Sequence, residues 1–140
     1  MSVTQGLCRT FPAEVFQGEH NLQSDTIKMA LYDISADLDP STITEYTTTD
    51  EVSGSGYTAG GVGVTISINP ANQVELNIDA VTLQSADIEF RGALLYNATN
   101  ANKGIGIIDT YKTQDVNGDL VFQFDRPQSF FVIQLNEILP

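Results

Sequence analysis

Apolar and polar residues alternate one for one in several short runs of this chain, and this period of two constrains its fold more than any other feature. Successive side chains of a β-strand point to opposite faces, so alternation puts the apolar residues of a run on one face. The clearest runs are residues 25–32, 62–68 and 73–79. In the second of them every other residue is Val or Ile. The pattern predicts half-buried strands.

Further apolar runs extend this prediction to the end of the chain. They are residues 81–83, 88–96, 103–111, 120–124 and 130–136. Between two of them, Asn117-Gly118 favours a two-residue hairpin turn, because both positions tolerate positive φ. About seven or eight short strands, with no repeating strand–helix pattern, predict an all-β fold, an antiparallel β-sandwich of jelly-roll or Ig-like type.

One short helix is predicted near the N-terminus, in residues 12–18. Pro12 suits the first helical turn, and Gly18 suits the position just after the last turn. The helix would have about two turns. We expect it to pack Val15 and Phe16 against the body of the protein.

The chain has the length and composition of one domain. It has 140 residues, of which 41% are hydrophobic and 17% charged, unlike a disordered chain. The single Cys8 cannot form an intramolecular disulfide, so packing has to hold the fold. We expect a β-sandwich domain at residues 12–140 and an N-terminal arm at residues 1–11, in which Leu7 and Phe11 are exposed to a partner.

Residues 33–61 lack alternation and are rich in Asp, Thr, Ser and Gly, with no Lys or Arg. A loop of this length is uncommon in a compact domain and is usually functional or disordered. Its glycines can adopt positive φ. We expect residues 38–61 to be mobile in the isolated protein, and Tyr57 to become ordered on contact with a partner.

The charge of the chain excludes several classes of partner. Six Lys and Arg against eighteen Asp and Glu give a net charge of −12, and the basic residues are scattered. Nucleic-acid binding requires clustered cations, and anionic membrane surfaces repel such a chain. No run approaches the roughly 18 to 20 apolar residues of a membrane span, and the N-terminus lacks the pattern of a signal peptide. We expect no nucleic-acid or membrane partner, and synthesis in the cytoplasm.

Residue types that serve catalysis and metal binding are sparse. Cys8 is expected to pack as a small hydrophobe, and His20 to hold the turn before the first long strand through a side-chain hydrogen bond; a Cys8–His20 nucleophile–base pair is the alternative. Asp115, Asn117 and Asp119 have the spacing that begins a calcium loop, but no Glu follows at the required offset. We expect no enzymatic activity, no cofactor and no metal site.

Three segments resemble a family of small structural proteins of tailed-bacteriophage particles. Residues 18–31 are similar to the family's Gly-x-His-Asn turn followed by Asp-Thr-x-Lys-x-Ala-Leu, and residues 51–61 to its Val-x-Gly-x-Gly-Tyr-x-x-Gly-Gly segment. A weaker match is residues 79–83, followed by Ala-Leu-Leu-Tyr at 93–96. The family often has Trp where Leu83 stands and another near the C-terminus, whereas this chain has none.

The resemblance implies a virion structural protein, and most specifically a capsid cement or decoration protein that binds the outer head surface and stabilises the shell. Its partners would be the major capsid protein and further copies of itself, as a homotrimer on a threefold axis. The candidate partner contacts are Leu7, Phe11 and Tyr57. The alternatives are a component of the tail or head–tail connector, and a carbohydrate-binding β-sandwich for host recognition, for which a chain without Trp is poorly equipped.

Overall fold

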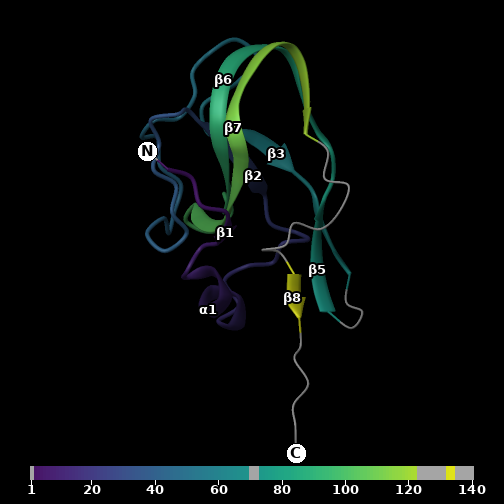
Figure 1. Cartoon of the computed structure of the whole chain (residues 1–140). Helices are drawn as coiled ribbons and strands as arrows, with labels where there is room; N and C mark the ends of the chain where they lie inside the picture. Colours follow the sequence, from purple (N-terminus) through teal and green to yellow (C-terminus); the bar gives the residue numbers. More distant parts are fainter. Residues whose placement is uncertain (1, 70–72, 123–131, 135–140) are drawn as a thin grey trace, which may run out of the picture.

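The computed structural model describes residues 2–69, 73–122 and 132–134. In this part the chain is mostly antiparallel β-structure with one short helix, so the all-β prediction is confirmed (Figure 1). The elements are β1 (Gly6–Leu7), α1 (Phe11–Phe16), β2 (Ile27–Tyr32), β3 (Val62–Val64), β4 (Ile66–Asn69), β5 (Gln73–Ile78), β6 (Val81–Asn97), β7 (Lys103–Phe122) and β8 (Val132–Gln134).

The strands form two sheets. The larger has five strands in the order β1-β7-β6-β2-β3, and the smaller has three in the order β4-β5-β8. All of these neighbours are antiparallel. Residues 62–68, expected to form one strand, are instead divided at Thr65 between β3 and β4, which belong to different sheets. The alternation of apolar and polar residues predicts which face of a sheet each side chain occupies. It does not predict with which neighbouring strand the backbone forms its hydrogen bonds.

A long hairpin of β6 and β7 dominates the larger sheet, and its two strands rise side by side and arch over together (Figure 1). The sequence predicted shorter strands here with a turn at Asn117-Gly118, and that prediction is wrong. Gly118 pairs with Ala86 beside a register shift, so its positive φ of 135° serves an irregularity within the strand. The turn instead lies between Asn97 and Lys103.

Strand β2 is buried on both faces, although its alternation predicted only one. It lies between β6 and β3, and Met29, Ala30, Leu31 and Tyr32 are all fully buried. Alternating side chains on a strand face opposite ways, so both faces of this strand are covered.

The predicted turn at residues 69–72 and the last predicted strand, 130–136, lie mostly outside the described residues, which include only Val132–Gln134 of that run.

The predicted N-terminal arm is not free: Gly6–Leu7 form β1 of the larger sheet and Phe11 begins α1, so the expectation of an arm is wrong for these residues. Strand β1 pairs with Gly106 and Ile107 of β7. On its other side, the N–H of Thr4 donates to Leu38 O and that of Arg9 to Pro40 O, both at 2.8 Å. The segment is therefore held between β7 and residues 38–40.

Residues 54–61 are packed closely against the sheet, contrary to the expectation of a loosely held loop. A Cβ added at Gly56 would lie 2.6 Å from Ala86 Cα, and one added at Gly61 only 2.1 Å from Met29 O. The N–H of Asp87 also donates to Ser55 O at 2.9 Å. These glycines let the backbone of the loop approach the strands, so here they serve contact and not mobility.

The close approach of Gly61 yields a stability prediction. Gly61→Ala should lower the free energy of unfolding by at least ~2 kcal/mol, because the new Cβ meets backbone and φ is +92°. Gly63→Ala is the matched control, since nothing lies within 4 Å of its added Cβ; its effect should stay within about 0.5 kcal/mol. Urea unfolding measures both, and equal stability of the two variants would contradict the packing described.

Candidate functional site

The surface beside α1 carries an apolar hollow of about 180 Å³. It is lined by Leu7 of β1 and by four residues in and around the helix, Phe11, Pro12, Val15 and Phe16. Sequence reasoning had singled out Leu7 and Phe11 as partner contacts, and the structure brings these two together here.

The side chains of α1 are buried and exposed in a different pattern from the one expected from the sequence. Phe11 is only 1% exposed and belongs to the core, so the expectation that a free monomer exposes it is wrong. Phe16 is 91% exposed and Val15 37%, so the expectation that these two pack inward is also wrong. Phe11 and Glu14, three positions apart, share the inward face of the helix, which directs Phe16 to solvent.

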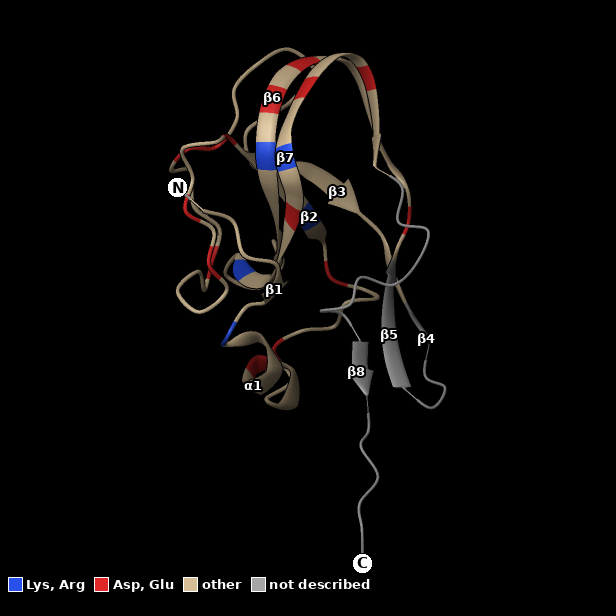
Figure 2. Ribbon diagram, in the orientation of Figure 1, with Lys and Arg blue, Asp and Glu red and all other residues tan. Residues whose placement is uncertain are grey.

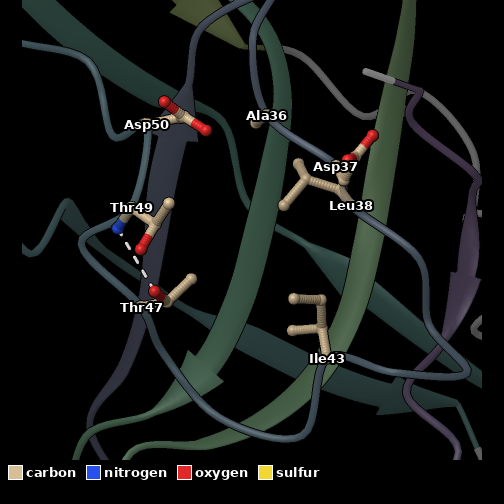
Figure 3. A pocket seen from close by; sticks show the side chains of 7 residues that line it. All are labelled: Ala36, Asp37, Leu38, Ile43, Thr47, Thr49 and Asp50. Carbon is tan, nitrogen blue, oxygen red and sulfur yellow. Dashed lines mark hydrogen bonds between the residues drawn. The ribbon is translucent and has the colours of Figure 1, made fainter.

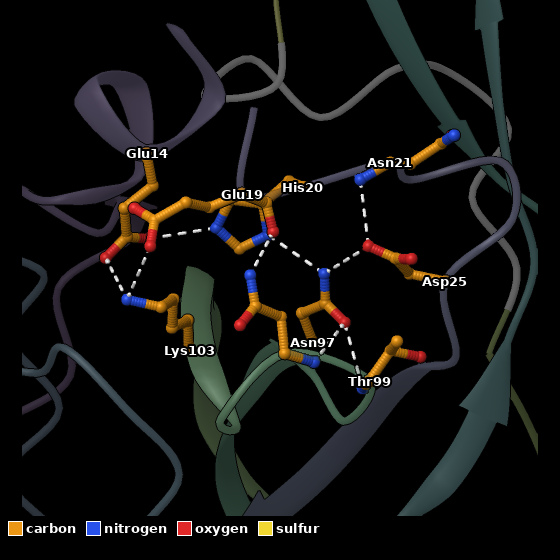
Figure 4. Close-up of polar contacts among 9 residues, drawn as sticks. Glu14, Glu19, His20, Asn21, Asp25, Asn97, Thr99 and Lys103 are labelled. Atoms are coloured by element: carbon orange, nitrogen blue, oxygen red, sulfur yellow. Dashed lines mark hydrogen bonds and ion pairs between the residues drawn. The ribbon is translucent and has the colours of Figure 1, made fainter. Parts of the chain in front are cut away.

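Below the helix, a polar cluster centres on the buried Asn97 (Figure 4). Its Oδ1 accepts the N–H groups of Thr99 and Asn100 at 3.0 and 3.3 Å, which fixes the orientation of the amide. The Nδ2 group therefore faces the other way, where it donates to Asp25 Oδ2 at 2.7 Å and to His20 Nδ1 at 3.0 Å. The pKa of Asp25 is lowered by the backbone N–H of Asn21 and, second, by Asn97.

This orientation assigns the tautomer of His20. Because Nδ1 accepts from Asn97, the proton is on Nε2, which donates to Glu14 Oε1 at 2.9 Å. The His20 side chain is fully buried, and its ring lies 4.8 Å from that of Phe11. The expectation that His20 holds this turn through a hydrogen bond is confirmed. With both nitrogens engaged, His20 has none to offer Cys8 as a base.

A lysine extends the cluster to the hairpin turn. Lys103 Nζ lies 3.2 Å from Glu19 Oε1 and 3.8 Å from Glu14 Oε2. A six-residue helix has little stability of its own. Lys103, the first residue of β7, and His20 therefore hold α1, and with it the hollow, in place.

Cys8 lies in the core, as expected for a small hydrophobe. Burial, and second the charge of Glu14, raise the pKa of its thiol to about 12. The thiolate, which is the reactive form, is therefore suppressed at neutral pH.

Tyr57 does not belong to the hollow. Its hydroxyl donates to Glu51 Oε2 at 2.6 Å and accepts from the N–H of Leu31 at 3.0 Å, and its side chain is buried. Burial raises the pKa of Tyr57, and the bond to Glu51 raises it further. Glu51 also accepts from Tyr46 and from the N–H of Gly60, at 2.6 and 2.8 Å. Tyr57 thus ties the loop to β2, and the expectation that it waits for a partner to order it is wrong.

Sequence reasoning missed the residues that support the hollow. Glu14 and Asn97 belong to no motif, and their contacts with His20 span 6 and 77 positions. The apolar pair Val15-Phe16 at the end of a short helix was the available signal for the hollow, but it was interpreted as core.

The described residues contain no group of three or more His, Cys, Asp or Glu placed to hold a metal ion. Asp119, of the calcium-like spacing, accepts the N–H of Ser85 at 2.8 Å. No helix among the described residues is long and apolar enough to cross a membrane.

Comparison with protein-family models, curated proteins and solved structures finds no match to this chain.

The polar cluster predicts a large stability effect of His20. His20→Ala should lower the free energy of unfolding by ~3 kcal/mol, because it removes two hydrogen bonds and leaves Glu14 and Asn97 short of a partner. Asn21→Ala, in the same turn but with an exposed side chain, should stay within about 0.5 kcal/mol. Urea unfolding decides this, and a His20→Ala protein as stable as Asn21→Ala would refute the assigned role.

The burial of Cys8 predicts that its thiol is unreactive in the folded protein. A maleimide should leave native protein unlabelled and modify one site per chain after denaturation. A Ser53→Cys variant, with a thiol at an exposed position, should take one label in the native state and serves as the control. Mass spectrometry gives the count. Rapid native labelling of the unaltered chain would show that Cys8 is accessible.

Proposed function

We propose that this chain is a non-enzymatic structural protein of a tailed-phage virion, most specifically a capsid cement protein that binds the outer head surface and stabilises the shell. The observation that carries the proposal is the apolar hollow beside α1, with Phe16 almost fully exposed at its edge. The occupant that we propose is an apolar side chain of the major capsid protein.

Contact energetics favour the hollow as an anchor. Covering an aromatic side chain removes about 150–250 Å² from water. At about 25 cal/mol per Å² this is worth ~4–6 kcal/mol before the cost of association. Exposed charge pairs contribute only ~0–1 kcal/mol each, and salt weakens them. Apolar contact at the hollow therefore dominates the attachment.

The support of α1 also favours attachment. The helix is held by the bond from His20 to Glu14 and by Lys103, so little order has to be gained when a partner covers it. His20 lies in the Gly-x-His-Asn turn of the resembling segment, residues 18–21. The turn that contributes to the resemblance therefore also contains the histidine that stabilises the helix at the proposed contact.

The charge distribution favours a partner that is less negative than this chain. Acidic residues are spread over the hairpin and the loops, and basic residues are few (Figure 2). We propose that the two sheets are the layers of the β-sandwich implied by the resemblance. We also propose that the copies form a homotrimer, which suits the threefold positions of a shell.

The proposal predicts how surface variants bind. Phe16→Ser and Val15→Ser should each weaken binding of tagged protein to decoration-free capsids, and Phe16→Ser by at least about tenfold, because loss of an anchoring aromatic costs ~2 kcal/mol. Moderate salt should reduce the bound copies only modestly. Phe11→Ser is unsuitable as a test, because Phe11 belongs to the core.

The controls are Ile34→Ser and Tyr111→Ser, which remove side chains that are 59% and 76% exposed and do not line the hollow. Both should bind like the parent protein. Full binding by Phe16→Ser at unchanged thermal stability would refute the hollow as the contact. Absence of binding by the parent protein to capsids would refute the cement role.

A further inference from the structure

Strand β7 has a free edge along the arched part of the long hairpin (Figure 1). Strand β1 pairs with β7 only at Gly106 and Ile107, and an irregularity of β7 follows at residues 110–113. Beyond it, residues 114–118 pair with residues 86–90 of β6. Among the described residues no strand lies on the other side of β7 at residues 114–121. The outward N–H and C=O groups of such an edge are unpaired and can accept a further strand.

The inner face of the hairpin is less covered at β7 than at β6. Leu83 and Ile88 of β6 are buried, whereas the residues directly opposite them, Leu120 and Val116 of β7, are only half-buried. On its outer side β6 is flanked by the segment of residues 54–57, but within the described residues β7 has no such neighbour here. Apolar surface therefore extends to the free edge, where a further strand would cover it.

The opposite face of the same hairpin is acidic. Asp115 and Asp119 of β7 are exposed, and so are Asp87 and Glu89 of β6. Glu89 lies directly opposite Asp115, and like charges in this arrangement destabilise a strand pair. Residues 81–90 and 114–121 contain no Lys or Arg, and Figure 2 shows acidic positions along the arch with basic positions of the hairpin below it. A cation beside these carboxylates would relieve the repulsion.

These features determine which kind of segment fits the edge. A second copy of the chain fits poorly, because pairing two such edges would bring the Asp115 and Asp119 side chains of the two copies close together. Successive side chains of a strand point to opposite faces. A segment in which Lys or Arg alternates with apolar residues therefore places its cations on the acidic face and its apolar side chains on the inner face.

We propose that an extended segment of a partner protein, with Lys or Arg alternating with apolar residues, adds as a strand to the free edge of β7 at residues 114–121. Its apolar side chains lie beside Val116 and Leu120, and its cations lie beside Asp115 and Asp119. Main-chain hydrogen bonds hold such a segment, and the alternating side chains select it. This inference does not depend on the capsid role, since it concerns a different surface and is tested on purified protein.

The test is an NMR titration of the full, ¹⁵N-labelled chain with a capped peptide in which Lys and Val alternate over about seven residues, a length typical of a strand. Saturable shifts are expected at the amides of residues 114–121. At saturation, the outward-pointing amides of this edge should exchange with solvent at least about tenfold more slowly, because they then donate to the peptide. Shifts without this protection, or no saturable shift, would overturn the proposal.

Two further peptides of the same length separate strand addition from attraction by charge. One has the same residues with its lysines in one block and its valines in another, so it keeps the charge and loses the alternation. The other alternates Glu with Val. Both should bind at least about fivefold more weakly than the alternating Lys and Val peptide. Equal binding of the block peptide would mean that charge alone attracts the probe, and equal binding of the Glu peptide would contradict the charge match. Either result would overturn the proposal.

A pair of variants locates the contact. Asp115→Asn should weaken binding of the alternating Lys and Val peptide at least about threefold at low salt, because it removes one cross-strand charge pair. Asp50→Asn is the control: it makes the same change of net charge beside a second hollow, between β2 and β3, whose lining includes no residue of the hairpin (Figure 3). It should bind like the parent protein. Equal affinity of the two variants would show that the peptide does not lie beside Asp115, and the proposed edge would be wrong.

Discussion

The pairing of β6 with β7 is the interaction on which the rest of the structure depends. The ladder runs from Val81 opposite Phe122 to Asn97 opposite Lys103, and the other strands of the larger sheet join it, β2 on one side and β1 on the other. Gly56, in the segment of residues 54–61, lies against this ladder at Ala86, and Lys103, beside the turn that closes the hairpin, contacts Glu14 of α1. The apolar hollow beside α1 therefore lies on a segment that this hairpin helps to position.

Polar side chains determine the local conformation wherever regular structure is short. The cluster of Glu14, His20 and Asn97 holds a helix too short to persist alone, and Glu51 holds the loop through hydroxyl and backbone donors. Buried polar groups have defined partners and directions, so such clusters specify one arrangement where apolar contact alone would tolerate several. The position of α1 and of the hollow beside it is consequently determined by polar residues that lie beneath the surface.

Elements whose formation depends on the local pattern of residues could be predicted from the sequence. Contacts between segments that are distant in the sequence could not. Alternation located β2 and β5, Pro12 and Gly18 located the helix, and the isolated His20 was assigned correctly to a turn. The Asn117-Gly118 pair misled, because positive φ serves a strand irregularity as well as a turn. The composition of residues 33–61 suggested mobility. Nothing in the local sequence shows that Gly56 and Gly61 pack against the backbone of distant residues, Ala86 and Met29. For the same reason Phe11 and Tyr57 could not be recognised as buried.

The position of β1 has a consequence for the order in which the chain folds. Gly6 and Leu7 pair with residues 107 and 106, so the first strand to be synthesised has to wait until β6 and the beginning of β7 have left the ribosome. Contacts this distant in sequence carry a large loop-closure entropy and form slowly. Until then the apolar residues at the start of the chain, including Cys8 and Phe11, have no sheet to cover them. The nascent protein is therefore most exposed to aggregation at its N-terminal end, the same region that carries the apolar hollow once folding is complete.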